Sequence, residues 1–234
     1  MAAAVLLIAY FVRGLAGFGS GLIAIPLLAL HLPLTLVVPL VVFLDYLASA
    51  SHGLSDRAQI RWREILPLLP FTAVGVVLGL YLFQTIDTLV LAHALGIFII
   101  AYAVYTLLAR DKETPVSRRW AAPAGFLGGL TGTLFGTGGP FYVLYLKHRA
   151  LPKTQFRATF ATIFLIDGAG RLSGYLGGGF FDRDWLQLAV FAVPLMAIGL
   201  FIGGRVHTGI DQRTFQVAVS VLLIISGISL LLRH

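Results

Sequence analysis

Two glycine-rich breaks interrupt long apolar segments of this chain, and each break carries a hydroxyl side chain between two glycines, Ser20 in the first and Thr137 in the second. If the chain turns at these glycines, the returning half-helix begins with unpaired backbone N–H groups and partial positive charge from the helix dipole. Such a helix start binds anions, and a hydroxyl group adds a further donor. The candidate binding residues are Gly17, Gly19, Ser20, Gly21, Gly136, Thr137, Gly138 and Gly139. The competing interpretation is that these glycines only let helices pack closely.

Four ionisable residues lie within or beside the apolar segments, where charged groups are costly and face a cavity or a partner. Asp45 and Asp167 occupy equivalent places after the two breaks, and a desolvated carboxyl group there can load and release a proton. Arg171 follows Asp167 by four residues, so the two share a helix face, as an anion site or as a structural ion pair. Arg13 directly precedes the first glycine-rich run and either adds charge to the site or reaches lipid headgroups. The hypothesis is therefore substrate binding at Arg13 and Arg171, with proton coupling at Asp45 and Asp167.

The composition is that of an integral membrane protein. Hydrophobic residues make up 58% of the 234 residues, charged residues make up 12%, and the mean hydropathy is +0.91. The apolar segments run about 20 residues without the alternation of a membrane barrel, so we expect membrane-spanning helices. The net charge of +7 fits basic cytoplasmic loops better than it fits a nucleic-acid partner. Without cysteines or ligand-spaced histidines, and without a GxxxxGK[ST] loop, we expect no metal, cofactor or ATP-driven step.

An internal duplication divides the chain into two halves. Residues 69–79 match residues 193–203 at a shift of 124, and other matches follow in the same order. Each half contains one broken apolar segment and three plain ones. The broken segments are 1–30 and 120–146, and the plain segments are 34–52, 64–83, 88–109, 158–180, 185–204 and 212–232. We therefore predict a first membrane repeat at 1–109, a cytoplasmic linker at 110–119 and a second membrane repeat at 120–234.

The basic residues favour broken segments that are re-entrant, entering the membrane, turning at their glycines and leaving on the same side. With that topology, thirteen of the 17 lysines and arginines lie on one side, as the positive-inside rule requires. Three crossings per half then invert the two halves relative to each other, a recurring design of secondary transporters. We predict an all-α membrane protein of two inverted repeats, each with a re-entrant broken helix and three transmembrane helices. A broken helix that spans the membrane in each half is the alternative.

The residues after the first break carry a resemblance to a known family. That break runs into the sequence LIAIPLL at residues 22–28, and a second glycine-rich break lies at mid-chain within a four-plus-four duplication. The chain resembles the TauE/SafE sulfite exporter family of bacterial membrane permeases over nearly its whole length. Residues 157–159 resemble the alanine-threonine segment that opens the helix after the second hairpin, whereas residues 36–39 have no such pair. The resemblance implies export of sulfite, sulfoacetate or another small organosulfur anion.

Together these features predict a multi-pass secondary transporter of the bacterial inner membrane. We expect it to export a small anion such as sulfite or an organosulfonate. Its site would lie at the paired glycine breaks near the midplane and would be exposed to each side in turn. An anion channel is the nearest alternative. An intramembrane enzyme would need a nucleophile with a base, or a metal pair, and neither pattern is found in the sequence. The expected partners are the anionic substrate and the lipid bilayer, with the oligomeric state left open.

Overall fold

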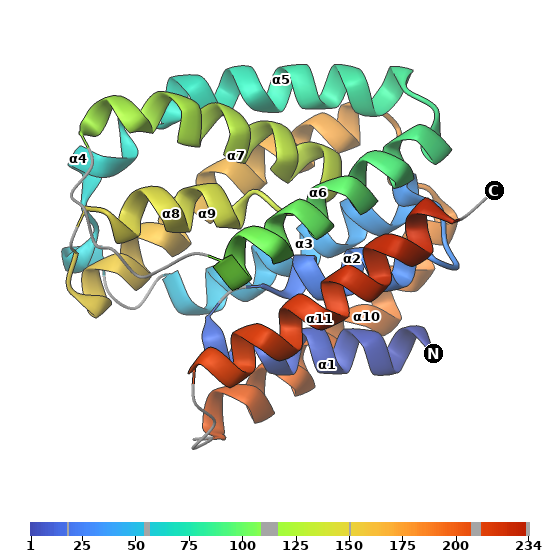
Figure 1. The fold of residues 1–234 in the computed structure, drawn as a ribbon. Coiled ribbons are helices and arrows are strands. Elements are labelled where there is room, and N and C mark those ends of the chain that lie inside the picture. The colour runs from blue at the N-terminus through green and yellow to red at the C-terminus, as the bar shows by residue number, and fades with distance from the viewer. Residues whose placement is uncertain (18, 54–56, 109–116, 150, 207–211, 233–234) are drawn as a thin grey trace.

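The chain folds as a stack of helices. The computed structural model describes residues 1–17, 19–53, 57–108, 117–149, 151–206 and 212–232, and within these ranges every regular element is a helix (Figure 1). The helices are α1 (Ala2–Ala16), α2 (Ser20–Ala29), α3 (Leu34–Gly53), η1 (Arg57–Gln59), α4 (Trp62–Ile65), α5 (Leu69–Thr85), α6 (Thr88–Leu108), η2 (Arg118–Trp120), α7 (Ala121–Phe135), α8 (Gly139–Lys147), α9 (Lys153–Gly177), α10 (Arg183–Arg205) and α11 (Gln212–Leu231).

Both broken segments are interrupted at their glycines. The first segment forms α1 and α2, and the second forms α7 and α8. The φ angles of Gly17, Gly19 and Gly136 are 83°, 99° and 62°, a left-handed backbone conformation that residues with a Cβ rarely adopt. The glycines therefore end α1 and α7 and turn the chain at two places, which we call the first tip (residues 17–21) and the second tip (residues 136–140).

Two plain segments begin elsewhere than the sequence predicts. The segment expected at 64–83 is divided into the short α4 and the longer α5, because Pro67 has no N–H for an α-helical hydrogen bond and disfavours helix at the residue before it. Pro70 lies in the first turn of α5, where proline is tolerated. Helix α9 begins at Lys153, directly after Pro152, five residues before the expected start. The predicted linker falls largely on 109–116, outside the described residues.

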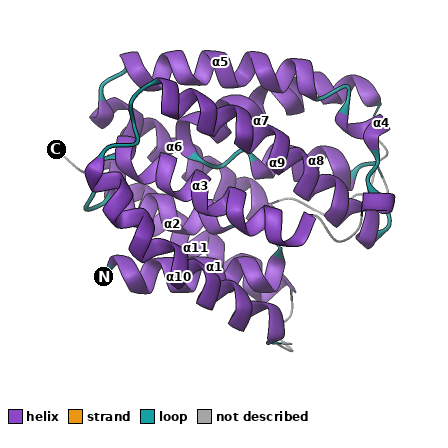
Figure 2. Cartoon of the chain, turned by 180° about the vertical axis from the view of Figure 1, so that it is seen from behind, coloured by secondary structure: helices purple, strands orange, loops and turns teal. Residues whose placement is uncertain are grey.

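Each broken segment packs against a helix of the other half of the chain. A Cβ added to Gly14 of α1 would lie 2.7 Å from the backbone nitrogen of Gly204 in α10, and one added to Gly199 would lie 2.8 Å from the carbonyl oxygen of Leu7. Leu7 contacts Gly199, and the later residue Gly14 contacts the later residue Gly204, so α1 and α10 run parallel. Figure 2 shows the two helices side by side from behind. The glycines allow the two backbones to approach closely.

Helices α5 and α7 form a second close pair. A Cβ on Gly125 would lie 2.6 Å from the carbonyl oxygen of Leu68, and one on Gly79 would lie 2.8 Å from the Cβ of Thr133. These contacts again follow the same order in both helices, so α5 and α7 are parallel. Helix α3 packs against α9, and α6 against α11.

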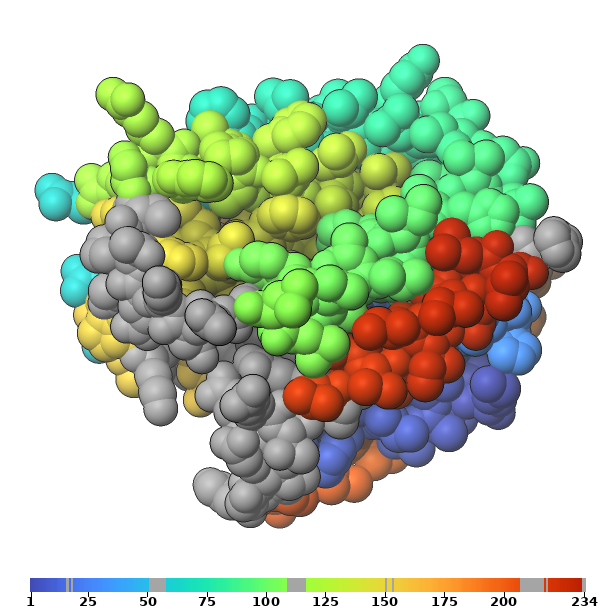
Figure 3. All heavy atoms as spheres, viewed as in Figure 1, coloured from blue at the N-terminus to red at the C-terminus, as the bar shows by residue number. Residues whose placement is uncertain are grey.

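The outer helices present apolar surfaces. Figure 3 shows α6 and α11 side by side across one face of the molecule. Helices α6 and α10 are long and apolar enough to cross a membrane, with mean hydropathies of 2.0 and 2.2. Only 33% and 28% of these apolar stretches are buried inside the protein, which leaves most of their surface available to lipid.

Candidate functional site

The two glycine-rich tips touch each other. A Cβ placed on Gly21 would lie 2.7 Å from the carbonyl oxygen of Gly136, so the backbones of the two tips are in direct contact. A Cβ on Gly136 would collide with the side chain of Ile25 and lie 3.6 Å from that of Val42. Glycine is therefore required at both positions by space, and at Gly136 by backbone conformation as well.

A small cavity lies where the tips meet. Its volume is about 20 Å³, enough for about one water molecule. An anion of several heavy atoms does not fit in this space. The cavity is lined by Arg13, Gly19, Gly21, Leu22, Asp45, Gly136, Thr137, Gly139, Pro140 and Phe164. A larger open depression of about 450 Å³ lies at residues 181–186 and shares no residue with the tips.

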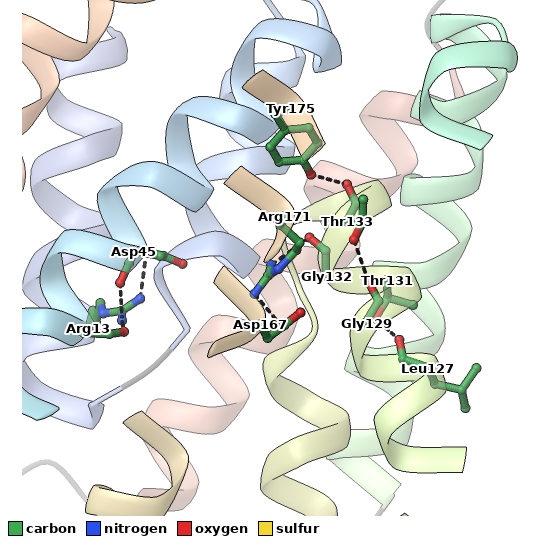
Figure 4. Close-up of polar contacts among 11 residues, drawn as sticks. Arg13, Asp45, Leu127, Gly129, Thr131, Gly132, Thr133, Asp167, Arg171 and Tyr175 are labelled. Carbon is green, nitrogen blue, oxygen red and sulfur yellow. Dashed lines mark hydrogen bonds and ion pairs between the residues drawn. The ribbon is translucent and has the colours of Figure 1, made fainter. Parts of the chain in front are cut away.

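An arginine and an aspartate form a buried network beside the first tip. Arg13 Nη1 lies 2.7 Å from Asp45 Oδ1, and both residues are 6% exposed. The guanidinium group also donates to Ser20 Oγ at 2.9 Å and to Ser49 Oγ at 2.7 Å. The hydroxyl groups of Ser20 and Tyr10 donate to Asp45 Oδ1 at 2.6 Å and 2.8 Å. Arg13 therefore points into the protein and not toward lipid headgroups (Figure 4).

Thr137 supplies a hydroxyl group to the same cavity. The side chain of Thr137 is buried, and its Oγ1 has no hydrogen-bond partner within the described part of the chain. Helix α8 begins two residues later at Gly139, with Pro140 in its first turn. The cavity thus combines the Arg13–Asp45 ion pair, a hydroxyl donor at Thr137 and the starts of α2 and α8, where unpaired backbone N–H groups concentrate.

The second ion pair is not among the residues that line this cavity. Arg171 Nη2 is 2.6 Å from Asp167 Oδ2, and Nη1 donates to the carbonyl oxygen of Gly132 at 2.9 Å (Figure 4). The Arg171 guanidinium lies 6.0 Å from the ring centre of Phe164, and that ring lines the cavity. Arg171 also lies close to the second tip, because a Cβ on Gly132 would be 3.0 Å from Arg171 Nη1 and 3.5 Å from the Cα of Gly138.

The structure brings most of the sequence-predicted residues together. Those that line the cavity are Arg13, Gly19, Gly21, Asp45, Gly136, Thr137 and Gly139. Ser20 is bonded to two of them and lies directly beside the cavity. Gly17 is exposed at the end of α1, and Gly138 packs against Gly128 of α7. Asp167 and Arg171 lie outside the cavity lining, with Arg171 bonded to Gly132 of α7.

Sequence reasoning missed several residues of the site. Tyr10 lies three residues before Arg13 and Ser49 lies four residues after Asp45, so helical spacing could have placed each on the same face as its partner. Phe164 gave no such signal, because a phenylalanine in an apolar helix is indistinguishable from a core residue.

A third group of charged residues connects α4 to the end of the second broken segment through hydrogen bonds and ion pairs. Glu64 accepts hydrogen bonds from the Tyr145 hydroxyl at 2.8 Å and from Arg149 Nε at 2.9 Å, and its carboxylate pairs with Arg118 at 3.2 Å. Burial acts to raise the pKa of the Glu64 carboxyl group, but the hydrogen bonds and the two arginines outweigh it, and the pKa is lowered from its ordinary value of 4.5. The carboxylate is therefore charged at neutral pH.

Known proteins match this chain over most of its length. The family model described as "Sulfite exporter TauE/SafE" matches residues 2–230. A relative from Comamonas testosteroni, "Probable inner membrane transporter protein TsaS", is 32% identical over 195 residues, which cover 82% of this chain and 81% of the relative. No solved structure matches the chain.

Proposed function

The chain belongs to the sulfite exporter TauE/SafE family, and from that premise we propose that it exports a small anion, such as sulfite or an organosulfonate, across the bacterial inner membrane as a secondary transporter. The family and the relative are membrane transporters, which agrees with a chain that is not an enzyme. Substrate, direction and coupling are proposals that go beyond this membership.

The meeting of the two tips carries the proposal. Residues 17–21 and 136–140 lie more than a hundred residues apart in the sequence, yet Gly21 and Gly136 are in contact beside one cavity. Arg13 and Thr137 line that cavity, and α2 and α8 begin at it. A guanidinium, a hydroxyl group and two helix starts are the groups that hold an oxyanion.

We propose that the halves are inverted repeats with re-entrant first segments, divided at 1–109, 110–119 and 120–234. The pairing of α1 with α10 and of α7 with α5 supports this, because each pair joins a broken segment to the second plain segment of the other half and both pairs are parallel. In Figure 1, α1 and α7 run in opposite directions, as inverted halves require.

The small volume of the tip cavity supports alternating access over an open channel. A channel needs a continuous path, whereas the space between the tips holds about one water molecule. Substrate would enter only after the tips move apart on one side and would leave after they move apart on the other.

The Arg13–Asp45 pair suggests how a proton could be coupled to the anion. An anion bound to Arg13 would compete with Asp45 for the guanidinium group. Asp45, once without its cation, would favour its protonated form in a buried site. Asp167 would act in the same way through Arg171.

Uptake into proteoliposomes tests the proposal. Labelled sulfite would be added with sulfoacetate, sulfate or thiosulfate as competitors, with and without an imposed pH gradient. We expect saturable uptake with counterflow that is weakened in Thr137→Ala. Uptake linear in driving force would indicate a channel, and no uptake of any tested anion would refute the substrate class. Gradient-driven uptake that is unchanged in Asp45→Asn and Asp167→Asn would refute proton coupling.

A further inference from the structure

One arginine of the second half reaches the first tip. Arg157 extends from the start of α9, and a Cβ on Gly17 would lie 4.0 Å from Arg157 Nη2. This is an ordinary contact distance, so the guanidinium group touches the tip. Both residues are exposed, and Gly19, two residues after Gly17, lines the tip cavity. Arg157 is not part of the cavity lining and stands at the exposed edge of the tip.

The guanidinium group of Arg157 forms no hydrogen bond or ion pair with the residues that the structure describes. Other arginines at this end of the molecule have carboxylate partners, since Arg118 and Arg149 both pair with Glu64. An anion that binds a paired arginine must compete with the carboxylate. An anion that binds Arg157 displaces no such partner.

A contact with the first half orients the start of α9. The Arg61 backbone N–H group donates to Thr159 Oγ1 at 3.0 Å, and Arg61 Nε donates to Gln155 Oε1 at 2.7 Å. Gln155 and Thr159 are four residues apart and share one face of α9. Arg157 lies midway between them in the sequence and therefore projects from the opposite face, toward the first tip. Arg61 thus holds α9 in the rotation that directs Arg157 at Gly17.

The length of α1 places the first tip toward the cytoplasm. In the proposed topology, three crossings separate the first broken segment from the cytoplasmic linker, so both of its ends lie on the outer side. The 15 residues of α1 span about 22 Å, which is most of the roughly 30 Å hydrocarbon core. Gly17 then lies past the midplane, on the same side as the start of α9. The exposed edge of the first tip, with Arg157, faces the cytoplasm.

The second tip differs, because apolar side chains cover it. Gly136 ends α7 as Gly17 ends α1, but Gly136 is buried. The atoms nearest to a Cβ on Gly136 belong to the side chains of Ile25 and Val42. In inverted halves this tip faces the outer side. An anion would therefore meet a cation at the cytoplasmic edge of the site and apolar side chains at the outer edge.

The internal duplication has the same asymmetry. Pro33 precedes α3 as Pro152 precedes α9. Counted from these prolines, Val38 occupies the position that corresponds to Arg157. Val38 is fully buried and carries no charge. The arginine at this position therefore belongs to one half of the duplication only.

We propose that Arg157 captures the anion at the cytoplasmic edge of the tip site and makes the apparent affinity higher from the cytoplasm than from the outer side. The inference rests on the proposed function and its topology, and it assigns a polarity to the same site. An exposed cation raises the local concentration of anions and so their rate of binding, and salt screens this effect. The gradients still set the direction of net flux, but export would saturate at a lower anion concentration than import.

Uptake into membrane vesicles of opposite orientation tests the inference. Inside-out vesicles present labelled sulfite to the cytoplasmic face, and right-side-out vesicles present it to the outer face. In about 0.1 M salt, the half-saturation concentration of the wild type should be about threefold to tenfold lower in inside-out vesicles. In Arg157→Gln this difference should disappear, because the inside-out value rises. In about 1 M salt, where the Debye length is about 3 Å, the wild type should also lose the difference.

Arg63→Gln is the matched control. Arg63 is exposed on α4 and lies on the same side of the membrane in the proposed topology, so its replacement removes the same charge from the same surface. The half-saturation concentration of this variant should stay within about twofold of the wild-type value in both kinds of vesicle.

A cysteine variant tests the charge itself. The chain contains no cysteine, so Arg157→Cys has a single thiol. Alkylation with 2-bromoethylamine adds an ammonium group, and alkylation with iodoacetamide adds a neutral amide of similar size. Both products are thioethers, which sulfite does not cleave. We expect the ammonium group to restore the low half-saturation concentration in inside-out vesicles and the amide to leave it high.

Three results would overturn the inference while the proposed function stands. The first is equal half-saturation on the two faces of the wild type, and the second is a wild-type difference that persists in Arg157→Gln. The third is equal restoration of Arg157→Cys by both reagents, because the charge would then be irrelevant. A wild type that takes up no sulfite from either face would overturn both the inference and the proposed function.

Discussion

Replacing Gly21 by alanine should separate the two tips. The added Cβ would lie 2.7 Å from the carbonyl oxygen of Gly136 and 3.7 Å from Asp45 Oδ2. Ordinary contacts of a Cβ begin at 3.4 Å, so the backbones must move apart by about 0.7 Å. The atom in the way belongs to the backbone of a left-handed glycine, which cannot rotate aside as a side chain could.

The expected loss of stability follows from two opposing contributions. Overpacking a close contact costs about 1–3 kcal/mol. Alanine gains up to about 1 kcal/mol over glycine in a helix, and Gly21 lies in the first turn of α2. We therefore expect Gly21→Ala to lower the free energy of unfolding by about 1–2 kcal/mol, which is a fall in Tm of about 2–8 °C for a chain of this length.

Thermal unfolding in detergent and sulfite uptake in proteoliposomes measure the two effects of Gly21→Ala. Gly170→Ala is the matched control, because a Cβ at this position of α9 meets nothing within 4 Å. The control should be as stable as the wild type or more stable, and should transport normally. If Gly21→Ala matched the control in both assays, the tips would not be held against each other in the working protein.

Three further substitutions probe the charged and polar groups. Arg13→Gln leaves Asp45 buried without its cation and should lower the free energy of unfolding by about 3–5 kcal/mol. The double variant Arg13→Gln with Asp45→Asn should recover most of that loss in the same unfolding assay. A double variant no more stable than Arg13→Gln alone would refute the pairing. Thr137→Ala removes a hydroxyl group without a described partner together with a buried methyl group, so the free energy of unfolding should fall by about 1 kcal/mol or less. The half-saturation concentration for sulfite should rise about tenfold, and an equal affinity would exclude this hydroxyl group from the site. Glu64→Gln should lower stability by about 1–3 kcal/mol at neutral pH. Because the pKa of Glu64 is lowered on folding, its stabilisation is present above the ordinary value of 4.5 and is lost as the pH falls through the folded-state pKa. The difference in Tm from the wild type should narrow in acid, and a constant difference would contradict this reasoning.

The sequence located the tips because local backbone geometry demands glycine there. Gly19 and Gly136 adopt conformations that other residues avoid, so clustered glycines within apolar segments mark the turns. The sequence could not separate these positions from Gly14, which lies within α1 and packs against α10. That distinction depends on which helix lies opposite, and the opposite helix comes from the other half of the chain.

The two buried ion pairs differ in the same way, because one can be predicted from spacing along a helix and the other cannot. The pairing of Asp167 with Arg171 follows from a spacing of four residues on one helix. The pairing of Arg13 with Asp45 joins α1 to α3 across 32 residues, and no spacing rule predicts it. The contact of Phe164 with the tip cavity and with the Arg171 guanidinium likewise follows only from the packed fold.

The packing of α1 against α10 has a consequence for biosynthesis. The partner of α1 within its own half, Asp45, is made soon after Arg13, so this ion pair can form early. The glycine-lined face of α1 must wait for α10, which begins at Arg183. At about 5–20 residues per second, translation of the intervening chain takes on the order of 10–30 s. During that interval the glycine-lined face of α1 is exposed to lipid or to the insertion machinery. In a chain truncated before α10, this face would stay exposed permanently, and quality-control proteases could recognise it.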